Sequence, residues 1–139
     1  MAALTSLVRS LLPRSKARHA SARRLALAQS AYYVATGVWP LLSLKTFEAL
    51  TGPKTDRWLV RTVGLLAAST GAGLAHAAQR GSVAPETRTI AVLSAFSFAA
   101  IDVYYVYRQR ISRVYLLDAI AEAALVAAWL RTSAHGDER

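Results

Sequence analysis

The sequence contains no cysteine, a single methionine and only eight acidic residues. The lack of cysteine excludes a disulfide framework, thiol chemistry and cysteine-ligated metal sites. No HExxH, GxSxG or Walker motif occurs, and no pair of histidines has the spacing of metal ligands. The sequence therefore predicts no cofactor and no metal site, and it offers no recognisable catalytic motif.

Charge is also scarce within four long segments, which together carry three acidic residues and no Lys or Arg. These segments are residues 25–44, 62–79, 89–107 and 114–130. A helix needs roughly 20 mostly apolar residues to cross a bilayer. An Ala-rich soluble bundle would instead need a polar face with helical period, and the first three segments lack one. The pattern predicts an all-α fold, a four-transmembrane-helix bundle.

The N-terminal 24 residues form a basic arm, with six Lys or Arg and no acidic residue. Apolar residues recur at helical spacing over residues 4–12, which suits an amphipathic helix on anionic lipid. A basic leader without acids is also typical of an organellar transit peptide. Residues 25–131 are expected to form one four-helix domain, and residues 132–139 a polar tail.

Most basic residues lie at the ends of the apolar segments, where anionic headgroups would meet them. The net charge of +9 therefore indicates a lipid bilayer as partner. Nucleic acid is not expected, because no RNA- or DNA-binding motif is present. If the spans alternate, the face with both termini carries ten of the 17 Lys and Arg residues. The positive-inside rule then places both termini in the cytoplasm.

Three carboxylates lie inside the apolar segments: Asp102, Asp118 and Glu122. Ionisable side chains at such depth usually face the bundle interior and find a partner. At about 1.5 Å of rise per residue, Asp102 and Asp118 lie roughly 8–9 Å from the same membrane face, with Glu122 deeper. Arg61, just before the second segment, falls at a similar depth on that side. The four residues are predicted to form a polar cluster.

Asp118 and Glu122 are four residues apart on one helical face, which Tyr115 continues, and Tyr105 shares a face with Asp102. Like charges at this spacing repel, so one acid should be protonated or a cation should lie between them. Three interpretations follow. The arginine pairs with a carboxylate and fixes the bundle, the cluster is a pocket for a ligand headgroup, proton or ion, or the carboxylates are protonated and idle.

The charged stretch FEALTGPKTDRWLVRTVG, residues 47–64, joins the first two segments at the same face as the carboxylates. Glu48, Asp56 and Trp58 are therefore candidates for a lid over the cluster. Helix capping and interfacial anchoring explain the same residues. Small residues four apart, at 67, 71 and 75 and at 119, 123 and 127, predict close helix packing.

Two stretches carry a resemblance to a protein family. YYVATGVWPLLSLKTFEALTGPKTDRWLVRTVG (32–64) and IDVYYVYRQRISRVYLLDAIAE (101–122) resemble the two halves of small, uncharacterised four-helix integral membrane proteins of bacteria. The resemblance covers about residues 30–130. It implies the four-helix fold and a bacterial inner membrane, and it implies no activity.

Three classes of function are compatible with these features. The first is a membrane protein whose polar cluster stabilises the bundle and binds a lipophilic or amphipathic small molecule. The second is a membrane enzyme that uses Asp118 or Glu122 as acid or base on a lipid-like substrate. The third is a proton- or cation-coupled carrier, which at this size would have to be a homo-oligomer. The first class is preferred because it requires no catalytic motif. No nucleophile, metal or cofactor motif supports the second.

Overall fold

The structure, a computed structural model, describes residues 2–134, with side chains over residues 16–133. Every regular element in this range is a helix, which confirms the predicted all-α class. The five helices are α1 (Ala2–Leu42), α2 (Leu44–Thr51), α3 (Arg57–Gln79), α4 (Pro85–Tyr107) and α5 (Tyr115–Ala134).

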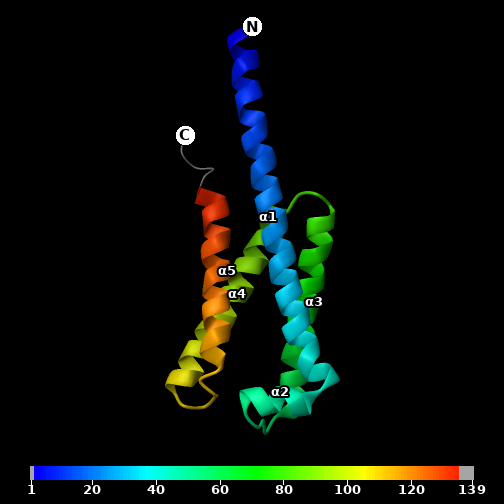
Figure 1. Cartoon of the computed structure of the whole chain (residues 1–139), viewed down its shortest axis with the longest axis vertical. Helices are drawn as coiled ribbons and strands as arrows, with labels where there is room; N and C mark the ends of the chain where they lie inside the picture. The colour runs from blue at the N-terminus through cyan, green and yellow to red at the C-terminus, as the bar shows by residue number, and fades with distance from the viewer. Residues whose placement is uncertain (1, 135–139) are drawn as a thin grey trace.

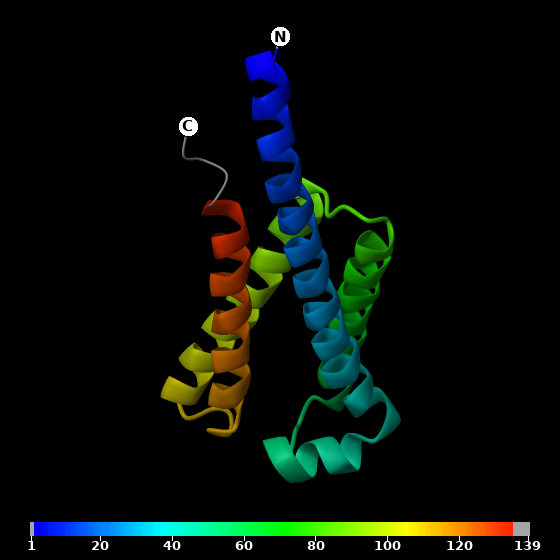
Figure 2. The same cartoon turned by 45° about the horizontal axis from the view of Figure 1, so that its top comes forward.

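The long helix α1 runs beside α3 on one side and near the α4–α5 pair on the other (Figure 1). It packs most extensively on α3, and α4 packs most extensively on α5, whereas α3 and α4 make few contacts. The short helix α2 and the α4–α5 connection lie at one end of the molecule. The N-terminal end of α1, the α3–α4 connection and the end of α5 lie toward the other (Figure 2).

The predicted boundary between arm and domain does not coincide with a helix end, since α1 continues unbroken from residue 2 to residue 42. Its N-terminal part projects beyond the other helices (Figure 1). The amphipathic pattern predicted over residues 4–12 lies outside the described side chains. Residues 135–139 of the predicted tail lie outside the described residues.

Three glycines bring α1 and α3 into close contact. Gly37 of α1 faces Gly64 of α3, and a Cβ added to either would meet backbone oxygen of the other. Farther along α3, Gly71 faces the carbonyl oxygen of Ser30. Ala67, between these points, is buried as well. The small residues predicted on this helix therefore form part of its contact with α1, as such residues do where two backbones approach closely.

Helix α2 overlaps the beginning of the stretch 47–64 that is predicted to join the first two segments. Ser43 caps it by accepting a hydrogen bond from the backbone N–H of Thr46. Gly52 ends it with a φ of 87°, which favours glycine. Trp39, near the end of α1, donates to the hydroxyl of Thr46 and packs edge-on against Phe47. These contacts fold α2 back against α1.

Two helices of the described region, α3 and α4, are long and apolar enough to cross a membrane. Only 22% and 17% of their most apolar windows are buried, so neither resembles the buried core helix of a soluble protein. The four-span prediction is therefore not confirmed. Helices α1 and α5 are not among these two, and both carry polar residues within their apolar segments. Several of those polar residues form the site described next.

Candidate functional site

Buried polar side chains gather where α1 meets the α4–α5 pair. Tyr33 of α1 donates a hydrogen bond of 2.9 Å to Oε2 of Glu122 on α5. The neighbouring Tyr32 donates to Oδ1 of Asp118, one turn earlier on α5. With Asp102 of α4 these residues form a group that we call the polar cluster: Tyr32, Tyr33, Asp102, Asp118 and Glu122.

Asp102 is the buried carboxylic acid that α4 contributes to the polar cluster. Its side chain adjoins that of Asp118, close enough for the two carboxyl groups to share a hydrogen bond. Asp102 is only 6% exposed, and its Oδ2 has no hydrogen-bond partner among the described residues. A buried acceptor without a donor is uncommon and indicates a missing partner. The predicted proximity of Asp102 and Asp118 is thus present, and it leaves one oxygen unsatisfied.

The cluster is acidic and partly open. Asp102 and Glu122 are buried, whereas Asp118 and Tyr32 are half-buried and form its mouth. Among the described side chains, neither Asp102 nor Glu122 has a Lys or Arg beside it. Carboxylates this close repel strongly at low dielectric unless a proton or a cation lies among them.

A second polar contact joins the same three helices away from the mouth. Gln29 of α1 is fully buried and donates a 2.9 Å hydrogen bond to the carbonyl oxygen of Ala91 on α4. Its Oε1 accepts a 2.7 Å bond from the indole N–H of Trp129 on α5. Trp129 also belongs to the apolar core at this end of the bundle, with Ala26 and Leu74. One amide therefore fastens α1 to both α4 and α5.

The prediction that Arg61 is the cation of the cluster is wrong. Arg61 is exposed on α3. The buried face of α3, which includes Gly64 and Gly71, is turned to α1, while α3 makes few contacts with α4. Depth along the membrane normal was the only criterion for Arg61, and it does not determine which way a helix face points.

The two tyrosines predicted beside the carboxylates have different positions. Tyr105 is 43% exposed and packs against the ring of Tyr104, so it does not join the cluster. Tyr115 is half-buried, three residues before Asp118, and Nζ of Lys54 lies 5.0 Å from the centre of its ring. Lys54 also donates a 2.8 Å hydrogen bond to the carbonyl oxygen of Thr51. Burial lowers the pKa of this lysine below its ordinary value.

The residues predicted as a lid do not cover the cluster by themselves. Glu48 binds Arg57 through two hydrogen bonds of 3.1 Å, and it accepts a third from the backbone N–H of Lys54. Asp56 is exposed before the start of α3, and Trp58 is 68% exposed. The loop between α2 and α3 contacts α5 through Lys54 instead, whose ammonium lies over the ring of Tyr115. Glu48 thus orders the loop that carries Lys54.

This loop should respond to acid. Hydrogen bonding from Arg57 holds the pKa of Glu48 below its ordinary value. A lowered pKa stabilises the folded loop at pH above the ordinary value and loses that effect as pH falls through the lowered one. In hydrogen exchange, we expect residues 48–57 of the native chain to be better protected than those of Glu48→Gln at about pH 6. The two should converge near about pH 3. Equal protection at both pH values would contradict the role given to Glu48.

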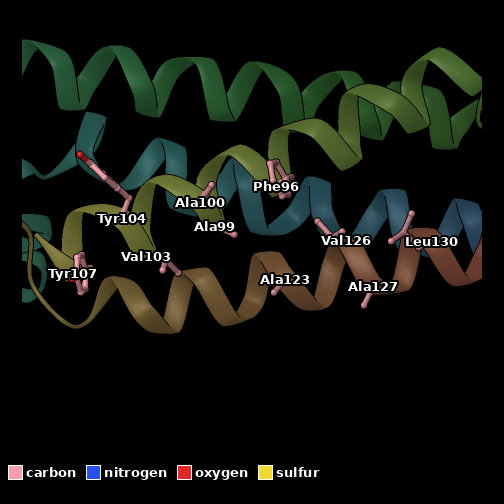
Figure 3. Close-up of a pocket in the computed structure, with 10 residues that line it drawn as sticks. All are labelled: Phe96, Ala99, Ala100, Val103, Tyr104, Tyr107, Ala123, Val126, Ala127 and Leu130. Atoms are coloured by element: carbon pink, nitrogen blue, oxygen red, sulfur yellow. The ribbon is translucent and has the colours of Figure 1, made fainter.

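A shallow apolar groove of about 710 Å³ runs between α4 and α5 (Figure 3). Its lining includes alanines from both helices, among them Ala99, Ala123 and Ala127, together with Phe96 and Leu130. Ala123 and Ala127 are exposed, so the small residues predicted to pack on α5 are buried only at Ala119. The groove brings no polar side chain of the cluster to the surface.

Sequence reasoning missed the α1 side of the site, namely Gln29, Tyr32 and Tyr33. Only formally charged residues were predicted to be buried polar groups, and the first apolar segment contains none. The sequence does indicate a polar contact on this helix, because Gln29 and Tyr33 are four residues apart and so lie on one face of an otherwise apolar helix. Trp129 was missed for the same reason, since an indole N–H needs an acceptor once it is buried.

Within residues 2–134, no group of three or more His, Asp or Glu side chains is arranged to hold a metal ion. The cluster can accept hydrogen bonds and attract positive charge. The chain matches no protein-family model, and no curated protein or solved structure is significantly similar to it. The resemblance to bacterial four-helix membrane proteins therefore stays a prediction based on the quoted residues.

Proposed function

We propose that this chain is a small integral membrane protein with four membrane-crossing helices. The spans are α1 from about residue 25, α3, α4 and α5. At about 1.5 Å per residue, the 23 residues of α3 and of α4 extend about 34 Å, enough for a hydrocarbon core of about 30 Å. The alternating course of the helices supports this proposal, since it brings the N-terminal end of α1 and the end of α5 toward one side (Figure 1).

The observation that carries the proposal is the orientation of the polar residues in α1 and α5. Gln29, Tyr33 and Glu122 are buried and hydrogen-bonded across helices. Large apolar side chains such as Leu66, Phe96 and Ile120 are exposed, each by more than half of its surface. Helices that lie in lipid keep polar groups inside and satisfy them there. The residues that lower the hydropathy of α1 and α5 are thus compatible with spanning.

We further propose that the polar cluster has two roles. It fastens α1 to the α4–α5 pair, and it accommodates the polar head of a lipophilic or amphipathic small molecule that enters at Asp118. We place the protein in a bacterial inner membrane, as the resemblance implies, and both termini in the cytoplasm, as the positive-inside rule favours. The apolar outer faces would contact lipid or, in a homo-oligomer, a second copy.

The topology can be tested with single cysteines, because the native chain has none and gives a clean blank. The substitutions are Ser21→Cys, Ser82→Cys and Ser133→Cys on the expected cytoplasmic side, and Thr55→Cys and Arg110→Cys on the opposite side. We expect an impermeant maleimide to label residues 55 and 110 in intact bacterial cells and the other three only after lysis. Labelling of residues 21 and 55 from the same side would show that α1 does not cross, and would contradict the four-span proposal.

A further inference from the structure

Asp102 is the residue of the polar cluster that indicates a bound hydrogen-bond donor. Its side chain is buried and adjoins Asp118, and its Oδ2 has no donor among the described residues. The hydroxyls of Tyr32 and Tyr33 are already directed to Asp118 and Glu122. A proton shared between Asp102 and Asp118 would reduce their repulsion, but it would bring no net positive charge to the cluster. The cluster therefore lacks a cation among the described side chains, and Oδ2 of Asp102 accepts no hydrogen bond from another described residue.

The walls of the cluster favour one kind of donor. The rings of Tyr32 and Tyr33 lie 6.2 Å apart, and Phe98 meets Tyr33 edge-on at 5.6 Å. Aromatic rings attract organic cations, and carboxylates accept their N–H bonds. A compact divalent ion fits less well, since the described acids are not arranged to hold a metal. An ammonium group supplies charge and several donors together.

We infer that the polar cluster binds the protonated primary amine of an amphipathic molecule, with the ammonium donating to Oδ2 of Asp102. The inference rests on the proposed function, because it names the ligand head that the intramembrane cluster would accept. Asp118 and Tyr32, which are half-buried, form the entrance. The ammonium enters there, and its apolar chain stays in the lipid.

The test uses the purified full-length chain in dodecyl maltoside and three probes that share one alkyl chain. They are dodecylammonium, dodecyltrimethylammonium, which has the charge without N–H donors, and dodecanol, which has neither. Calorimetry should show saturable binding of dodecylammonium and binding of the trimethyl probe weaker by about tenfold or more. Dodecanol should show only partition. Equal heats for all three would mean partition into micelles and would overturn the inference without any variant.

Variants add a second, independent measurement. Asp102→Asn should weaken dodecylammonium binding on the order of 30-fold, because a buried charged acceptor is lost. Asp56→Asn is the matched control, since it removes an exposed carboxylate outside the cluster, and it should bind as the native chain does. Undiminished binding by Asp102→Asn would overturn the site. If Asp102→Asn fails to fold, the comparison of the three probes on the native chain still tests whether the cluster binds a primary ammonium.

The amine could belong to an aminolipid or to a free amphiphile, and nanodiscs distinguish the two. In phosphatidylethanolamine discs an aminolipid site is already occupied, so dodecylammonium should bind more weakly than in phosphatidylcholine discs. Equal affinity in both indicates a free amine. If cysteine labelling shows four spans and dodecylammonium does not bind, water fills the site and this inference alone fails. If labelling shows two spans, the proposed function fails first.

Discussion

Replacing Gly37 by alanine is expected to separate α1 from α3 and to lower the free energy of unfolding by about 2–3 kcal/mol. A Cβ at this position would overlap the carbonyl oxygen of Gly64 and lie 2.7 Å from the backbone nitrogen of Ala68. Both atoms belong to the backbone of α3, so no side chain can rotate away to make room. The two helices must move apart, which weakens the other contacts along the α1–α3 interface, here called the α1–α3 seam.

The chain provides a graded control for this substitution. Gly71→Ala would place its Cβ 2.9 Å from both the oxygen of Ser30 and Cγ2 of Val34, and Val34 is a side chain that can shift. It should cost less than Gly37→Ala. Gly73→Ala meets nothing within 4 Å and replaces a helical glycine, so it should be neutral or stabilise by about 0.5–1 kcal/mol.

Unfolding of the four proteins in dodecyl maltoside by added dodecyl sulfate, followed by circular dichroism, gives the comparison. The order of stability should be Gly73→Ala, native, Gly71→Ala and Gly37→Ala, from most to least stable. A Gly37→Ala variant as stable as Gly73→Ala would show that the α1–α3 seam is looser than the described packing.

The α1–α3 seam and the polar cluster differ in how far the sequence could predict them. Small residues at a spacing of four identify the packing face of α3, because the helical period places them in one row. The sequence does not say which helix this row meets. The same pattern on α5 predicted burial at Ala123 and Ala127, which are exposed and line the apolar groove instead. A row of small residues permits close packing without requiring it.

The carboxylates were found because buried charge is rare in apolar segments, and that argument is independent of topology. Arg61 was assigned to them by depth alone, and depth leaves the rotation of each helix undetermined. Packing fixes that rotation, and on α3 the glycine contacts with α1 turn Arg61 outward. The true partners, Tyr32 and Tyr33, carry no formal charge. The sequence feature that identifies them is their hydroxyl groups, which are hydrogen-bond donors within the first apolar segment.

Replacing Tyr33 by phenylalanine is expected to destabilise the bundle through Glu122. Glu122 is 2% exposed, and the hydroxyl of Tyr33 is the donor described for it. Interhelical hydrogen bonds in membranes are worth on average about 0.6 kcal/mol and at most about 1.7. A buried carboxyl group left without its donor adds a desolvation penalty to that loss. We therefore expect a decrease of about 2 kcal/mol in the same unfolding measurement.

A double variant separates this penalty from loss of packing. Tyr33→Phe with Glu122→Leu removes both polar partners, and replacing both by apolar groups of similar size can be nearly neutral. The double variant should therefore be more stable than Tyr33→Phe alone, by about 1 kcal/mol or more. Tyr105→Phe, which removes an exposed hydroxyl, should leave stability unchanged. If the double variant is less stable than Tyr33→Phe, Glu122 stabilises the bundle through a partner other than Tyr33. The ammonium of a bound amphiphile would then be the first candidate for that partner.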